Sequence, residues 1–318
     1  MKKLNTFGRY LRSRYGTTVT KISLNLTGFT CPNIDGKVAR GGCTYCENES
    51  FSPNLGGSKE RFYLNTDSKE NPLLAKQLQQ IDLQYRGSRE HFRREYGVRK
   101  YIAYFQSFSN TYAPLETLKV LYQKAVDYED VVAISIGTRA DCVSDELFAY
   151  LKELSSKKEV WIEFGVQSIY DTTLEKINRG ETYAQVKAAI LKAKAYGLKV
   201  CAHMIFGLPD ETPEMMLEGT KEVAALGIDS IKFHPCYVVK NTMLANEYAQ
   251  GKFTPIDEAT YLDTLAKAVK LLPSTISIQR VTAGIANETL LAPAWCGTSK
   301  NYQMHRVREA LRKEGMEY

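Results

Sequence analysis

The sequence predicts an α/β fold built on a parallel sheet, because short apolar segments alternate along the chain with segments of helical periodicity. The expected strands are residues 19–26, 101–105, 131–136, 160–166, 199–206 and 230–235. The expected helices are residues 73–85, 114–126, 145–154, 182–196, 213–226 and 257–272. This strict alternation favours parallel strands joined by helical crossovers.

Taken in order, the first expected strand (VTKISLNL, 19–26) alternates apolar and polar side chains and is rich in β-branched residues. The next two are the apolar runs YIAYF (101–105) and VVAISI (131–136), and a segment with helical spacing follows each of them. Three more strand and helix pairs complete the series. Right-handed crossovers either curl such a sheet into a barrel or leave it open and doubly wound, and composition does not choose between these outcomes.

Composition sets broad limits on the protein. The 318 residues suffice for one large α/β domain or two small ones, and the apolar (44%) and charged (25%) fractions are ordinary for a globular protein. There is no run of about eighteen apolar residues and no signal-peptide core, so we expect a cytoplasmic protein with no membrane partner. The net charge of +6 permits a polyanionic partner without requiring one.

A cysteine array marks the candidate site. Cys31, Cys43 and Cys46 lie in a Gly-rich loop, residues 27–50, as a C-x11-C-x2-C pattern. Thiolates are soft ligands, which suit zinc or an iron-sulfur cluster. A structural zinc usually takes four protein ligands, yet no fourth cysteine lies nearby and the first histidine is His91. The seven cysteines of the chain favour reduced thiols over disulfides.

The cysteine array, with Tyr45 inside the CxxC, resembles that of the radical SAM superfamily. The CPN-DG and GGC segments resemble one branch of it, the YhcC/YtqA-like proteins, which are related to the radical SAM core of the Elongator catalytic subunit. The resemblance implies a partial (β/α)6 TIM-type barrel, open on one side, over residues 19–272. Two extensions would flank this barrel. The basic N-terminal one (1–18) would cap one end of the fold or contact phosphate, and the C-terminal one (273–318) would cover substrate or bind tRNA. It also implies that the three cysteines bind a 4Fe-4S cluster whose fourth iron chelates S-adenosylmethionine (SAM).

The same resemblance assigns residues at the strand ends to SAM, and these are Tyr45, Gln106, Ser107, Gln167, Arg179 and His203. Gln106 and Ser107 stand where the family has a Gly-rich turn whose carbonyl groups bind the methionyl amine. Gln167, in EFGVQS, would contact the ribose, and the planar guanidinium of Arg179 would contact the carboxylate. Arg139 and Asp141 either pair with each other or face substrate.

Two basic stretches bear on the substrate. Residues 86–100 carry six basic side chains against two acidic ones, and residues 300–313 carry five against one, both with interspersed aromatics. This pattern suits RNA, although solvated helical faces would look the same. The resemblance favours the C5 substituent of the tRNA wobble uridine, for example carboxymethyl removal toward aminomethyluridine, with a flavodoxin or ferredoxin as electron donor. The alternatives are a radical SAM enzyme for a small metabolite or tetrapyrrole, and a non-catalytic zinc-binding protein that interacts with RNA.

Overall fold

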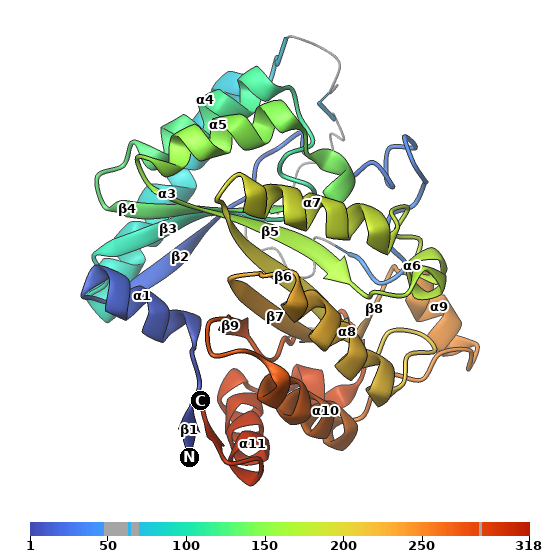
Figure 1. The fold of residues 1–318 in the computed structure, drawn as a ribbon. Helices are drawn as coiled ribbons and strands as arrows, with labels where there is room; N and C mark the ends of the chain where they lie inside the picture. Colours follow the sequence, from blue (N-terminus) through green and yellow to red (C-terminus); the bar gives the residue numbers. More distant parts are fainter. Residues whose placement is uncertain (48–62, 65–69, 286–287) are drawn as a thin grey trace.

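The computed structural model describes residues 1–47, 63–64, 70–285 and 288–318. Its centre is a seven-stranded, all-parallel sheet that curls into a partial barrel (Figure 1). The strand order is β2 (Val19–Leu24), β3 (Lys100–Phe105), β4 (Val131–Thr138), β5 (Glu159–Gln167), β6 (Lys199–Phe206), β7 (Ser230–Pro235) and β9 (Ser277–Arg280). The expected open α/β barrel is confirmed. The seventh strand, β9, lies beyond the six that the sequence pattern predicted.

Helices cover the outer face of the sheet (Figure 1). The six predicted helices are present as α3 (Leu74–Tyr96), α4 (Leu115–Val126), α5 (Asp145–Ser155), α7 (Tyr183–Ala195), α8 (Pro213–Ala225) and α10 (Glu258–Leu271). Hydroxyl and carboxylate N-caps, such as Thr182 and Asp257, fix several of their starts. Further helices are α1 (Phe7–Tyr15), α6 (Asp171–Lys176), α9 (Met243–Ala249) and α11 (Lys300–Lys313). Helix α3 continues eleven residues beyond its predicted end at Tyr85.

Strand alternation divides the side chains into two layers. On β7, Ile231 and Phe233 are fully buried in the main core, whereas Lys232 and His234 face the interior of the barrel. The same alternation on β5 sends Glu163 inward. The helix-facing layer is therefore apolar, while the inner face offers polar groups to a cavity.

The N-terminal helix packs beneath this inner face. Phe7 and Leu11 of α1 pack with Ile102, Trp161 and Cys201 in an apolar cluster. This cluster forms a floor under the cavity, at the amino ends of the strands.

Short strands tie the chain ends together. Strand β1 (Lys2–Lys3) pairs in parallel with β11 (Met316–Glu317). A second short pair, β8 (Val238–Val239) with β10 (Leu290–Ala292), lies outside the main sheet.

In the described part of the chain, no helix has both the length and the apolar character needed to cross a membrane.

Candidate active site

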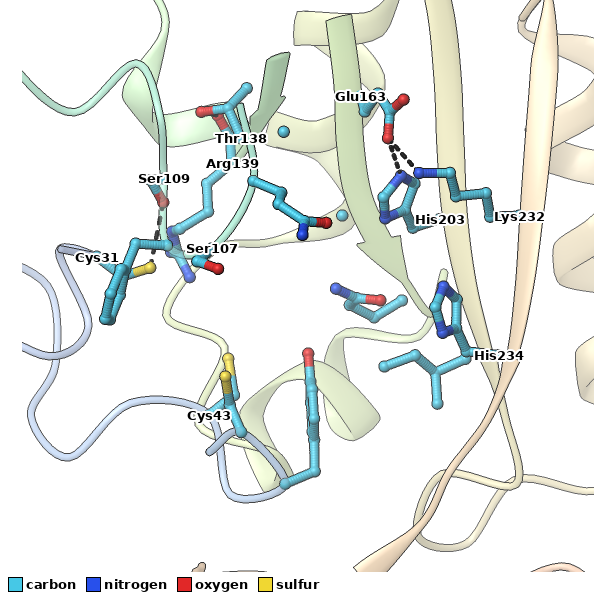
Figure 2. Close-up of a pocket in the computed structure, with 18 of the residues that line it drawn as sticks. Cys31, Cys43, Ser107, Ser109, Thr138, Arg139, Glu163, His203, Lys232 and His234 are labelled. Atoms are coloured by element: carbon cyan, nitrogen blue, oxygen red, sulfur yellow. Dashed lines mark hydrogen bonds and ion pairs between the residues drawn. The ribbon is translucent and has the colours of Figure 1, made fainter. Parts of the chain in front are cut away.

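The carboxyl ends of the strands and their following loops surround a cavity of about 520 Å³. All nine residues that the sequence assigned to the cluster or to SAM line it, and these are Cys31, Cys43, Cys46, Tyr45, Gln106, Ser107, Gln167, Arg179 and His203. Figure 2 shows the cysteines at one end of the cavity and a group around Glu163 at the other. The residues predicted from separate motifs therefore share one site.

The cysteine end has the chemistry of a metal centre. The Ser109 hydroxyl donates a hydrogen bond to Cys31 Sγ at 3.3 Å, and Asn33 Nδ2 donates one to Cys43 Sγ at 3.3 Å. Burial raises the pKa of Cys31 to about 11, and burial with the neighbouring Cys43 raises the pKa of Cys46 well above its usual range. Buried thiols such as Cys31 and Cys46 are poor thiolates by themselves, and a bound cation removes that penalty. These residues therefore fit an iron-sulfur cluster.

Arg179 connects the cysteine loop to the barrel. Its Nη2 lies 2.6 Å from Glu181 Oε1 and donates to the carbonyl oxygen of Gly165 at 2.9 Å, while Nη1 donates to Cys43 Sγ at 3.8 Å. Its Nε atom is buried and has no hydrogen-bond partner among the residues described. A buried donor without a partner costs free energy, so this atom suits an acceptor supplied by a ligand.

Arg139 forms a structural ion pair. Its Nε lies 2.9 Å from Asp141 Oδ1 and its Nη2 lies 2.6 Å from Asp141 Oδ2, in the planar fork geometry that a guanidinium favours. Its Nη1 donates to the carbonyl oxygen of Arg179 at 2.7 Å. Of the two alternatives for this pair, the structure shows the ion pair, and the pair holds the Arg179 backbone in place.

The turn after β3 adopts a conformation that glycine usually supplies. Ser107 has φ 68° and Phe108 has φ 58°, in the left-handed region, and Asn110 Nδ2 stabilises the turn by donating to the Ser107 carbonyl oxygen at 3.0 Å. Gln167, at the end of β5, has φ 65°. Such strained backbone gathers at functional sites. The left-handed backbone of a Gly-rich turn is thus present although the glycines are not.

A buried charge cluster at the opposite end was missed by the sequence analysis. Glu163 on β5 is buried, and one of its carboxylate oxygens lies 2.5 Å from Lys21 Nζ. The other oxygen lies 2.5 Å from Lys232 Nζ and 2.8 Å from His203 Nε2 (Figure 2). These groups come from β2, β5, β6 and β7, so only the curled sheet brings them together.

The protonation states in this cluster follow from burial and charge. Burial opposes ionisation of Glu163, but the charges of Lys21 and Lys232 outweigh it and hold the pKa of the carboxyl well below its usual range. Burial and the Lys232 charge lower the pKa of His203 to about 4. His203 is therefore neutral at pH 7, and Glu163 is ionised.

A sequence signal for this cluster exists in the strand pattern. Lys21, Glu163 and Lys232 each interrupt an apolar strand at an inward position, where a charged residue needs a buried partner. The sequence does not say which strand supplies that partner.

The two basic stretches differ in their position. Helix α3 begins near the end of β2, where Gln77 donates a hydrogen bond to the Thr27 carbonyl oxygen. Further along the helix, Arg89 forms an ion pair with Asp130, which lies just before β4. Its basic half therefore lies at the amino ends of the strands, away from the cavity. Helix α11 begins near Thr282, after β9, through Gln303, so its first turn lies at the carboxyl ends.

Comparison with known families identifies the fold. A model of the radical SAM superfamily matches residues 36–222, and a model of the Radical_SAM C-terminal domain matches residues 228–313. The chain belongs to the radical SAM superfamily. A 4Fe-4S cluster and SAM, expected from the sequence, are the cofactors of this superfamily. Membership also favours the iron-sulfur interpretation of the cysteines over zinc.

This radical SAM protein is similar to the protein YhcC of Escherichia coli K12, with 36% identity over 297 residues, 93% of this chain and 88% of the relative. It is 27% identical over 188 residues, 58% of this chain, to a tRNA uridine(34) acetyltransferase of Methanocaldococcus infernus, of which the match covers 34%. The fold matches an archaeal Elp3 from M. infernus with a TM-score of 0.63 and 20% identity, over 93% of this chain and 63% of that one. The expected YhcC-like branch is confirmed, and this radical SAM chain spans less than two thirds of either longer protein.

Proposed function

We propose that this protein reductively cleaves SAM and uses the resulting radical to abstract a hydrogen atom from the C5 substituent of a tRNA wobble uridine. The observation that carries the cofactor part is the convergence of three cysteines and the unpartnered Arg179 Nε on one cavity. When bound, the cluster supplies the electron that splits SAM into methionine and a 5'-deoxyadenosyl radical.

The protein's own residues bind and orient. We assign the cluster to Cys31, Cys43 and Cys46, and the methionyl carboxylate to Arg179, whose free Nε suits an anionic acceptor. The remaining SAM contacts fall to the carbonyl groups of the turn after β3, with Gln106 and Ser107, and to Tyr45, Gln167 and His203. The barrel wall excludes water and competing hydrogen donors from the reacting carbon.

The tRNA part rests on the similarity to a protein named as a tRNA uridine(34) acetyltransferase, and on the fold shared with Elp3. The first turn of α11, with Lys300 and Tyr302 exposed at the carboxyl ends of the strands, is suited to contact the RNA backbone. The wobble base would have to leave its stack to reach the interior. The reaction we assign is removal of a carboxymethyl group from the substituent nitrogen. The 5'-deoxyadenosyl radical would take one hydrogen atom from the methylene carbon, a second electron would return to the oxidised cluster, and water would cleave the resulting C=N bond to release glyoxylate and the amine. A flavodoxin or ferredoxin is the electron donor that we assign.

A small metabolite or tetrapyrrole is the second candidate substrate. The basic half of α3, one of the two stretches that suited RNA, lies at the far end of the strands from the cavity. The Arg89–Asp130 ion pair also neutralises part of its charge. Both observations weaken the case for RNA and so favour a small substrate. The volume of about 520 Å³ also lies in the range of small-molecule sites.

The test is anaerobic cluster reconstitution, followed by reduction with dithionite and chromatography of 5'-deoxyadenosine. Formation that rises with total tRNA from cells lacking this gene supports both parts of the proposal. Formation that tRNA leaves unchanged keeps the cofactor part and favours the second candidate. Cys43→Ala should abolish formation, whereas Cys296→Ala, which is buried outside the cavity, should keep it. Equal activity in both variants would refute the cluster assignment.

A further inference from the structure

The end of the cavity opposite the cysteines carries excess positive charge. Lys21, Lys232 and Arg280 line this end, and Glu163, which contacts the two lysines, is the carboxylate among the residues that line the described cavity. His203 adds no charge, because burial lowers its pKa to about 4, and the pKa of His234 is lowered as well. Three cations against one carboxylate leave two positive charges unbalanced.

Several donors at this end also lack acceptors. Gln279 Oε1 accepts from Lys21 Nζ at 2.7 Å, but the Nε2 atom of Gln279 is buried without a partner in the described structure. Lys232 Nζ donates to Glu163 and, at 3.1 Å, to the Tyr104 hydroxyl, which leaves one of its three protons.

Arg280 is the most available of these cations. It is exposed and lines the cavity, and among the described residues its guanidinium contacts His234 Nε2 at 3.4 Å, which is long for a hydrogen bond. Its guanidinium can therefore turn toward a ligand with most of its five donors unused.

The existing contacts preorganise the group instead of neutralising it. Glu163 draws Lys21 and Lys232 toward each other, and both ammonium groups lie over the Tyr104 ring, at 4.4 and 4.7 Å from its centre. Since two like charges side by side repel, a further anion would be stabilised here by charge and by hydrogen bonds together.

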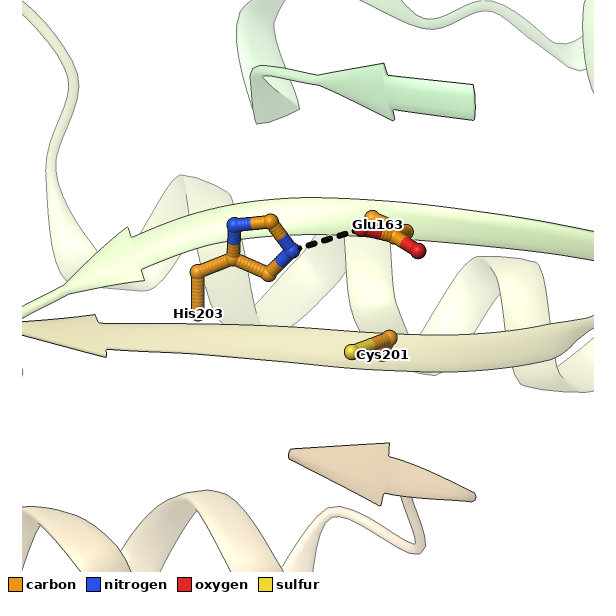
Figure 3. A group of neighbouring side chains, drawn as sticks. All are labelled: Glu163, Cys201 and His203. Atoms are coloured by element: carbon orange, nitrogen blue, oxygen red, sulfur yellow. Dashed lines mark hydrogen bonds and ion pairs between the residues drawn. The ribbon is translucent and has the colours of Figure 1, made fainter. Parts of the chain in front are cut away.

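A metal ion is the competing occupant. Glu163, Cys201 and His203 place an oxygen, a sulfur and a nitrogen within 4.8 Å of one another (Figure 3). Both Glu163 oxygens already contact ammonium groups, and burial raises the pKa of Cys201 to about 12. A divalent cation would have to sit beside two lysines, so the charges favour an anion.

We propose that Lys21, Lys232, Gln279 and Arg280 form an anion site that holds a carboxylate or phosphate group of the substrate, with the reacting carbon placed toward the cysteine end. This inference rests on the proposed function, because it names the chemical class of the substrate held in the same cavity. It applies equally to an acidic substituent on a nucleobase and to an acidic metabolite.

The test measures anion binding to the reconstituted, SAM-loaded protein. Inorganic phosphate and acetate are each titrated at constant ionic strength, and the apparent dissociation constant is taken from the rise in melting temperature. Arg280→Met should weaken anion binding about ten-fold, since it removes a charge-assisted hydrogen bond. Lys232→Met should weaken it about ten-fold or more for the same reason. Lys267→Met removes an exposed cation from α10 and serves as the matched control. Arg280→Lys should retain part of the affinity.

Three results would overturn the proposal. The first is phosphate and acetate binding that is absent, or equally strong in Arg280→Met, Lys232→Met and Lys267→Met. The second is anion binding that the reconstituted wild-type protein shows without SAM and loses when SAM saturates it, because the site would then belong to the SAM carboxylate. The third is stoichiometric Zn²⁺ binding, beyond the cluster iron, that His203→Gln abolishes.

The two measurements, anion binding and 5'-deoxyadenosine formation, also distinguish a failure of this inference from a failure of the proposed function. Anion binding requires the folded, loaded protein but no SAM cleavage. If 5'-deoxyadenosine forms while neither anion binds, the inference alone fails. If phosphate or acetate binds as expected but no 5'-deoxyadenosine forms, the proposed radical chemistry fails while the anion site stands.

Discussion

Replacing Glu163 by glutamine removes the carboxylate that the ammonium groups of Lys21 and Lys232 share, while it keeps the shape of the side chain. Both contacts are 2.5 Å long and Glu163 is fully buried, so the two cations would face each other without a counter-charge. Removal of one partner from a buried ion pair costs about 3–5 kcal/mol of unfolding free energy. We expect Glu163→Gln to fall within that range.

Lys232→Met should cost less, about 1–3 kcal/mol. In this variant Glu163 still contacts Lys21 and His203, and one charge balances the other. The double variant Glu163→Gln/Lys232→Met should be more stable than the sum of the single losses predicts, because it leaves one unpaired cation instead of two.

The assay is urea unfolding of all three variants without cofactors, followed by circular dichroism. Glu116→Gln, which breaks the exposed ion pair with Lys119, is the control and should change stability little. Strict additivity of Glu163→Gln and Lys232→Met, or a larger loss for Lys232→Met than for Glu163→Gln, would refute the shared-carboxylate reasoning.

Three further predictions follow from the same site. The pKa of His203 is about 4 in the folded protein against 6.5 ordinarily, so the unfolded chain takes up the proton first, and stability should fall as the pH drops from about 6.5 to about 4. His203→Gln should flatten that decline in pH-dependent melting curves, and an unchanged slope, or the same flattening in the exposed His91→Gln, would contradict the assignment. Ser109→Ala removes the hydrogen bond to Cys31 Sγ and should make the cluster's reduction potential more negative in an EPR-monitored titration, because such bonds favour the reduced, more negative state. Arg179→Met should weaken SAM binding about ten-fold in equilibrium dialysis, and an unaltered affinity would remove Arg179 from the SAM site.

The cysteine end of the site could be predicted from the sequence because its chemistry lies in contiguous motifs. Cys31, Cys43 and Cys46 fall within one loop, and the turn at Gln106 and Ser107 directly follows a recognisable strand. All of them line the cavity.

The charged end could not be predicted in the same way. Lys21 and Glu163 lie 142 residues apart, and Lys232 lies a further 69 residues along the chain, so each appears in the sequence as an isolated charge in an apolar strand. Which charges meet depends on the curl of the sheet, and that is a property of the whole fold. Partner choice therefore becomes visible only in three dimensions.

Two of the features that the sequence pattern missed have local explanations. Strand β9 is four residues long and contributes few apolar side chains to the pattern, so it lacks a strong signal. The final turns of α3, beyond Tyr85, are dominated by charged residues, which hides the helical periodicity. Phe92 nevertheless packs against the main core from this segment.

The pairing of β1 with β11 makes the two chain ends hydrogen-bonded neighbours, and Figure 1 shows them side by side. A circular permutant in which a short Gly-Ser linker joins Tyr318 to Met1 is therefore geometrically feasible. New ends could open at the exposed Gly251, between α9 and α10. A reductase domain could then be fused at a chosen point on the surface, which would make electron delivery independent of collision between separate proteins.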